Sequence, residues 1–205
     1  MGRAVMVSSS MSFVTKEFHI MPSFRPIGSV PGAYALPPVE AKPGWPLPDT
    51  GPFLRAFSGT EKPGAMMLHY ALGYIGIWRV IYDQGRDAPD TVHEQLALLT
   101  FAIDREAAAH TLQIPVTADT PVNPSSFGEM VSWLAWKYLL AALRQDLPAH
   151  REHDANQLVR HIEAFDRLVA DVQEGRVRLP ERATDIYPPK TFTPDTGGQS
   201  REKCR

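Results

Sequence analysis

The chain has 205 residues, of which 43% are hydrophobic, so it can bury the core of one domain with extensions at its ends. Its 21 basic and 23 acidic residues give a formal net charge of −2, and these totals lack the basic excess that nucleic-acid-binding proteins carry. The single cysteine, Cys204, cannot pair within the chain, which excludes an internal disulfide framework and favours an intracellular, reducing compartment.

The first part of the chain, residues 1 to 57, is predicted to be an extended, proline-rich arm. Ten of the 19 prolines lie at residues 22 to 63, and proline at this density forbids helix and interior strand. A weak alternation at residues 5 to 21 indicates one short strand. Isolated aromatic side chains such as Trp45 and Phe53 lie between the prolines, so we expect an ordered arm rather than a disordered tail. The sequence leaves open whether the arm packs on its own core or on another chain.

The most apolar stretch, residues 64 to 85, is predicted to be the central helix. It is free of proline and too long for one strand, Thr60 is a candidate N-cap, and Gly85 is the expected C-terminal stop. Gly73 and Gly76 lie near one line of small residues, which lets a neighbouring helix approach closely. The stretch is at the short edge of what crosses a bilayer and contains a histidine and an arginine, so no membrane span is expected.

The next proline-free window, residues 90 to 114, predicts a second helix with one buried face. It opens with Thr91-x-x-Glu94, a capping-box pattern that places the start of the helix near this threonine. Residues then recur at alternating spacings of four and three, which is one face of a helix. The members of this stripe are Val92, Leu96, Leu99, Ile103, Glu106 and His110.

Two later windows, residues 125 to 147 and 149 to 179, predict the third and fourth helices. Ser126-x-x-Glu129 is a second capping box, and the helix it opens is apolar on most faces, which indicates a central position. The last window is amphipathic and stops at Gly175, so its helix is expected to cover the others from outside.

The sequence therefore predicts an all-α fold, a bundle of four main helices with extensions at both ends. The helical domain is expected at residues 58 to 175, after the N-terminal arm at residues 1 to 57. Residues 176 to 205 contain four prolines and are expected to form an irregular C-terminal tail.

One helical face carries a candidate metal site. Glu106 and His110 are four residues apart at the end of the apolar stripe, and His69 on the first helix could face them. These three residues predict a divalent metal site, and no other cofactor is predicted. The favoured alternative is that the stripe frays into solvent, which leaves Glu106 and His110 as an exposed, salt-bridged pair.

A second histidine cluster opens the last helical window. His150 and His153 have chelating spacing and adjoin Asp154, and His161 lies about two turns further along. A third partner for a metal cannot be placed, so a solvated helix terminus is favoured.

The function that these features favour is non-enzymatic, because no nucleophile elbow or catalytic triad can be assembled from the sequence. We expect a protein–protein interaction or assembly protein, a subunit or accessory factor of a larger complex, that binds another protein or copies of itself. The alternative is a helical-bundle metal-dependent enzyme or metal binder. Aromatic residues of the arm and of the third helix are the candidate partner-binding residues. They are Trp45, Phe53, Phe127, Trp133, Trp136 and Tyr138.

Overall fold

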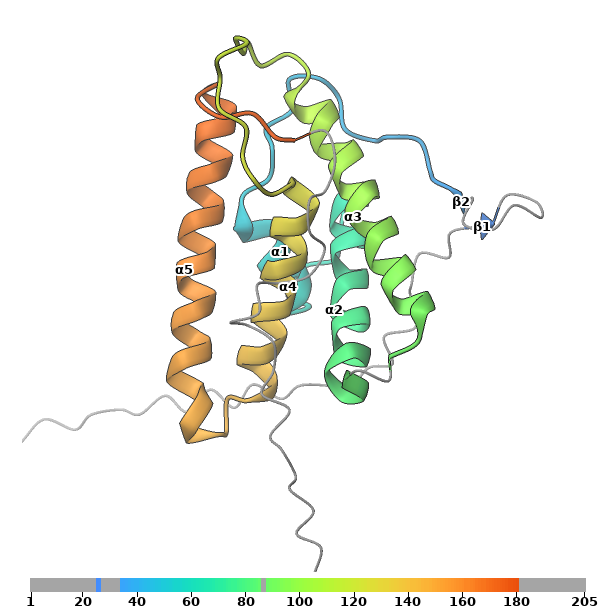
Figure 1. Ribbon diagram of the computed structural model, residues 1–205, viewed down its shortest axis with the longest axis vertical. Coiled ribbons are helices and arrows are strands. Elements are labelled where there is room, and N and C mark those ends of the chain that lie inside the picture. Colours follow the sequence, from blue (N-terminus) through green and yellow to red (C-terminus); the bar gives the residue numbers. More distant parts are fainter. Residues whose placement is uncertain (1–24, 27–33, 86–87, 181–205) are drawn as a thin grey trace, which may run out of the picture.

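The structure is a computed structural model that describes residues 25–26, 34–85 and 88–180. These residues are mostly helical, as the sequence predicts, and Figure 1 shows the long helices lying side by side. The expected strand at residues 5 to 21 and most of the expected C-terminal tail lie outside the described residues. Two short antiparallel strands, β1 (Arg25–Pro26) and β2 (Tyr34–Ala35), precede the helices. The helices are α1 (Thr50–Phe57), α2 (Met66–Gln84), α3 (Asp90–Thr111), α4 (Phe127–Leu143) and α5 (Pro148–Gln173).

Helix α1 contradicts the prediction that proline excludes helix from all of residues 22 to 63. Pro52 lies in its first turn, where a backbone N–H has no partner within the helix, so the missing donor costs little. Asp49 caps the helix, because its carboxylate accepts a hydrogen bond from the Gly51 amide at 2.9 Å. The buried Phe53 and Phe57 then hold α1 against the longer helices.

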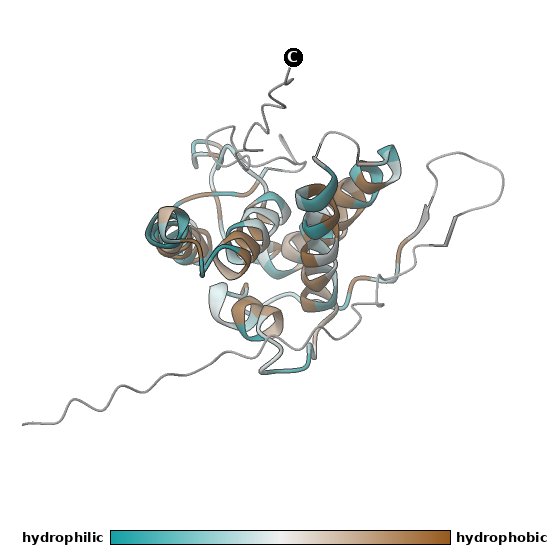
Figure 2. Ribbon diagram, turned by 90° about the horizontal axis from the view of Figure 1, so that it is seen from below, coloured by the Kyte–Doolittle hydropathy of each residue, from teal (hydrophilic) through white to brown (hydrophobic). Residues whose placement is uncertain are grey.

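The long helices share one hydrophobic core. Helix α2 contacts α3 and α4, α4 also contacts α3 and α5, and α1 packs against α2, α4 and α5. In Figure 2, α5 presents its hydrophilic residues outward and its apolar residues toward α4. The apolar part of the stripe predicted for α3, from Val92 to Ile103, is buried. Within the described ranges, none of the helices is both long and apolar enough to cross a membrane.

Two glycines let the helices approach closely. A Cβ at Gly73 would lie 2.9 Å from the Leu99 side chain, so the close approach predicted along α2 is made by α3. Gly76, predicted to contribute to the same contact, faces open space. At Gly128 a Cβ would lie 2.5 Å from the Thr100 carbonyl oxygen, which makes glycine necessary where α4 begins against α3.

The helix ends test the cap predictions. The capping box of Ser126 and Glu129 is confirmed, with both reciprocal hydrogen bonds formed. The box at Thr91 is wrong, because α3 begins at Asp90 and Thr91 therefore lies inside the first turn. Gly85 and Gly175 end α2 and α5 with φ of 59° and 71°, as the sequence predicts.

The predicted cap of α2 is wrong, because the helix begins at Met66 rather than near Thr60. Pro63 and Gly64 lie between the two residues and keep the chain out of helical conformation before Ala65. Ala65 has no side chain that can cap. The Glu40 carboxylate, from the arm, accepts the Met66 amide hydrogen bond at 2.6 Å instead.

Candidate functional site

Residues 36 to 49, which we call the strap, pack on the protein's own core. Figure 1 shows this segment passing over one end of the helices before the chain enters α1. Leu47 is buried, and its carbonyl oxygen accepts a hydrogen bond from Gln173 of α5 at 3.0 Å. The His110 Nδ1–H of α3 donates to the Trp45 carbonyl oxygen at 3.0 Å, since a carbonyl can only accept. The sequence left open whether the arm packs on its own core or on another chain, and for residues 36 to 49 the structure shows packing on the chain's own core.

Glu106 holds the strap to α3. Its side chain is 3% exposed, and its carboxylate accepts hydrogen bonds from the Glu40 amide at 3.1 Å and the Ala41 amide at 2.9 Å. The favoured expectation of an exposed, salt-bridged Glu106 is therefore wrong. Backbone amides of the strap satisfy the carboxylate in place of a cation, which makes its burial tolerable.

A solvent-open cleft of about 210 Å³ lies beneath the strap. Its wall is mostly apolar and comes from the strap, α1, the start of α2 and the last turns of α3. A cavity of about 150 Å³ can hold benzene, so this cleft has room for one ring or one long side chain. The lining residues are Glu40, Ala41, Trp45, Pro48, Pro52, Ala65, Met67, Leu68, Glu106 and His110.

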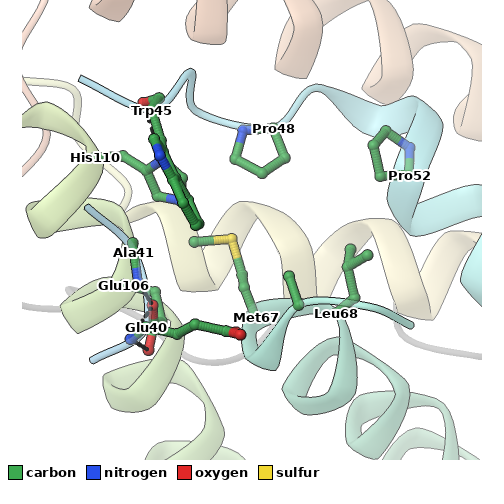
Figure 3. Close-up of a pocket in the computed structure, with 10 residues that line it drawn as sticks. Glu40, Ala41, Trp45, Pro48, Pro52, Met67, Leu68, Glu106 and His110 are labelled. Atoms are coloured by element: carbon green, nitrogen blue, oxygen red, sulfur yellow. Dashed lines mark hydrogen bonds between the residues drawn. The ribbon is translucent and has the colours of Figure 1, made fainter. Parts of the chain in front are cut away.

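The polar side chains that line the cleft are each held by a neighbouring segment of the backbone. Figure 3 shows the Glu40 backbone beside Glu106, whereas the Glu40 side chain extends toward the start of α2 near Met67. His110 carries a hydrogen on Nδ1, because this atom faces the Trp45 carbonyl oxygen. Trp45 is 47% exposed, and Lys42 Nζ lies 5.6 Å from the centroid of its ring, a cation–π contact.

The predicted metal site is not assembled. Glu106 and His110 meet at the cleft, but His69 is exposed on α2 and does not line it. Within the described part of the chain, no three His, Cys, Asp or Glu side chains gather closely enough to hold a metal ion. The Glu106 oxygens face the amides of the strap, which explains why this carboxylate does not turn toward His69.

The predicted partner-binding aromatic residues divide into two groups. Phe53, Phe127 and Trp136 are at most 1% exposed and lie in the core, so they are not available to a partner. Their rings pack on one another and on neighbours, for example Phe53 on Phe127 with centroids 6.3 Å apart. Trp133 and Tyr138 are partly buried against the core, so Trp45 is the most exposed member of the predicted set.

The second histidine cluster is also not assembled. Asp154 is buried and pairs with Arg144 at the end of α4 through contacts of 2.7 and 2.5 Å. His153 is exposed, whereas His161 is buried and donates from Nε2 to the Met130 carbonyl oxygen at 2.9 Å. Burial lowers the pKa of His161 to about 4, so the ring is neutral at pH 7.

A polar cluster that the sequence analysis missed lies where α2, α3 and α4 meet, with Tyr74 and Thr100 buried and Asp104 half-buried. The Tyr74 hydroxyl donates to Thr100 at 2.8 Å, and Asp104 accepts the Gly128 amide at 2.7 Å. Burial raises the pKa of Asp104 to about 6, with hydrogen bonds from Gly128 and Ser126 opposing the shift. These hydrogen bonds join the three helices to one another, which indicates a structural role for the cluster.

The cleft residue that sequence analysis most clearly missed is Glu40. Its signal was present, because it is the sole acidic residue among residues 22 to 48 of the printed sequence. No protein-family model, curated protein or solved structure shows a significant match to the chain. The strap, the cleft and Trp45 are therefore the basis for assigning a function.

Proposed function

We propose that the chain is a non-enzymatic protein–protein interaction or assembly protein, a subunit or accessory factor of a larger complex. It binds its partner through the strap of its proline-rich arm, which is carried by a bundle of four main helices. The observation that carries the proposal is the apolar cleft beside the exposed Trp45.

Trp45 has the properties of an interface anchor. Tryptophan is enriched among the residues that dominate binding energies, and such residues lie next to pockets that exclude water. The hydrogen bond from His110 to the Trp45 carbonyl and the prolines on either side restrict this part of the strap. Binding to a restricted segment loses less conformational entropy than binding to a free chain.

The aromatic helix α4, part of the sequence-based hypothesis, contributes less to this proposal. Its Phe127 and Trp136 are buried, so its remaining contribution to a partner surface is limited to the partly exposed Trp133 and Tyr138. The alternative of a metal-dependent enzyme or metal binder gains no supporting observation, since His69 lies apart from Glu106 and His110.

The proposal is tested by selecting a random-peptide library on immobilised full-length protein and remeasuring the enriched peptides on variants. Trp45→Ala removes the anchor and is expected to weaken binding about 30-fold, the effect of losing about 2 kcal/mol at a hot spot. Leu68→Trp fills the cleft and is expected to abolish binding of the same peptides.

The matched control is Val159→Ala, which removes an equally exposed apolar side chain from α5. Peptides should bind this variant as they bind the unchanged protein. Enriched peptides that bind Trp45→Ala and Leu68→Trp undiminished, or a library that yields no enrichment, would refute the proposal. Light scattering of the full-length protein over a range of concentrations then reports whether a second copy is itself the partner.

A further inference from the structure

We propose that two copies of this chain exchange the strap and α1, so that residues 36 to 57 of each copy dock on the long helices of the other. The exchanged pair makes between copies the contacts that a single chain makes within itself. This inference goes beyond the proposed function, because it names a second copy as a partner and a surface other than the cleft. The exchange rebuilds the same cleft in each half of the pair, so peptide binding does not depend on it.

The surface that receives the exchanged segment is the one that the segment covers in a single chain. Leu47 and Phe53 are 3% and 0% exposed on this surface, and Phe53 packs on Phe165 of α5 with centroids 6.0 Å apart. Asp166 of α5 accepts hydrogen bonds from the amide and the hydroxyl of Thr50. Every copy of the chain carries this surface, so it fits the segment of a second copy as well as its own.

The loop between α1 and α2 is the hinge of the exchange. Residues 58 to 65 are exposed, apart from the half-buried Pro63. The amides of Ser58, Gly59 and Thr60 donate to carbonyl oxygens of α1, so these bonds close the turn on α1 itself. When extended, residues 58 to 65 span up to about 28 Å, more than the width of two packed helices, about 20 Å.

Gly59 sets the direction in which the chain leaves α1. Its φ of 69° lies in the left-handed region and ends the helix by turning the chain back toward α2. An added Cβ would meet nothing within 4 Å, so a side chain here strains only the backbone of the turn. Opening this turn releases the segment from its own core and leaves the packing of the long helices unchanged.

A segment released from its own core is stable only on a second copy. The open chain exposes Leu47, Phe53 and Phe57 together with the apolar surface that they cover, which is unfavourable. Two open chains restore these contacts for each other in a closed pair. A short linker gives the segment an effective concentration of the order of millimolar at its own core, so the pair is expected to form as the protein approaches that concentration.

The first experiment measures the mass of the full-length protein by chromatography with light scattering after refolding at about 10 µM and about 1 mM. A monomer is expected at the lower concentration and a substantial dimer fraction at the higher. Gly59→Ala strains both closed chains, and one dimer relieves both strains. Its dissociation constant should therefore be about 30-fold lower than that of the unchanged protein.

The matched control is Gly64→Ala, in the same loop. Gly64 is also exposed, and an added Cβ there also meets nothing within 4 Å, but its φ is not positive. The dissociation constant of this variant should stay within about fivefold of the original.

The second experiment distinguishes exchange from ordinary association. Carbon-13-labelled and unlabelled chains are refolded together at about 1 mM, and isotope-filtered NMR detects contacts between the rings of Phe53 and Phe165. In an exchanged dimer this contact joins a labelled chain to an unlabelled one. In an ordinary dimer each chain makes it internally.

A dimer without the contact between labelled and unlabelled chains would overturn the proposal. So would a mass that stays monomeric at the higher concentration in both the unchanged protein and Gly59→Ala. If Gly59→Ala and Gly64→Ala shift the dissociation constant equally, the assignment of Gly59 as the hinge is wrong. The peptide library tests the cleft separately, so the proposed function stands or fails on its own result.

Discussion

Asp104, half-buried at the edge of the core, shows how one residue carries a measurable cost to stability. Its carboxylate accepts the Gly128 amide at the start of α4, and burial raises its pKa from 3.8 to about 6. A folded-state pKa above the unfolded value means that the folded protein binds the proton more tightly. The contribution of Asp104 to the free energy of unfolding is therefore largest below pH 3.8 and is lost as the pH rises through about 6.

We expect Asp104→Asn to stabilise the protein at neutral and alkaline pH. Asparagine is neutral and can still accept the Gly128 amide, so at pH 8 the free energy of unfolding should rise by about 1 to 3 kcal/mol. The gain should shrink to a small fraction near pH 4, where the folded-state aspartate is protonated and the unfolded-state aspartate is about half protonated. Urea unfolding of both proteins from pH 4 to 8 measures the difference, from which the contribution of His161 cancels because both proteins keep it.

The control for this substitution is Asp119→Asn, at an exposed loop position. It should leave the unfolding free energy within about 0.5 kcal/mol of the original at every pH. A gain in stability for Asp104→Asn that is the same at pH 4 and pH 8 would contradict the raised pKa.

At the scale of elements, the turn between α4 and α5 depends on one buried ion pair. Arg144 ends α4 and meets Asp154 of α5, with side chains 10% and 4% exposed. Two hydrogen bonds join the guanidinium to the carboxylate, which fixes the second turn of α5 against the end of α4. The pair satisfies both charges, whereas either charge alone would be buried without compensation.

Removing one partner of this pair should destabilise the protein strongly. We expect Asp154→Ala to lower the free energy of unfolding by about 3 to 5 kcal/mol, since Arg144 then loses its counter-charge. Asp146→Ala, which removes an exposed carboxylate from the same turn, is the control and should change it little. Equal losses in the two variants, measured by urea unfolding, would show that the pair contributes nothing particular.

A second feature at the scale of elements is that the strap and the helices satisfy each other's backbone amides. Glu106 of α3 accepts the strap amides, and Glu40 of the strap accepts the first amide of α2. Each carboxylate therefore satisfies backbone donors that lack a partner within their own element. The cleft lies between these two contacts, so its shape depends on both.

At the scale of the whole molecule, the strap and α1 belong to the core rather than to a detachable arm. Leu47 and Phe53 are 3% and 0% exposed, and Phe53 packs on Phe165 of α5 with centroids 6.0 Å apart. Thr50 is also held by Asp166 of α5, through hydrogen bonds of 2.9 and 3.1 Å. The strap and α1 are therefore attached to α5, the last helix, through the core.

We expect a chain that starts at Phe57 to lose cooperative folding. Deleting one buried phenylalanine side chain costs about 3 to 5 kcal/mol, and the truncation removes Leu47 as well as Phe53, against a total stability of about 5 to 15 kcal/mol. A chain that starts at Tyr34 keeps these side chains and is the control. Thermal unfolding followed by circular dichroism compares the two, and a sharp transition for the shorter chain would contradict the assignment.

The sequence by itself determined the features that local rules control. Helical periodicity and the absence of proline predicted α2 to α5, because amphipathic spacing and backbone sterics act within a few residues. The Ser126 box and the stops at Gly85 and Gly175 are likewise local. The stripe on α3 was also predicted, but the sequence could not show what Glu106 meets.

Only the tertiary structure determined the packing of the strap on the helices, the burial of Glu106 and the position of the cleft. The partners of Glu106 are the amides of residues 40 and 41, more than 60 positions away, and the cap of α2 is 26 positions away. Helix α1 was missed because its stability comes from burying Phe53 against α4 and α5, which outweighs the local effect of the prolines. Hydrogen-bond partners far apart in the sequence are brought together only by the folding of the whole chain. The spacing of residues within one helix therefore does not predict them.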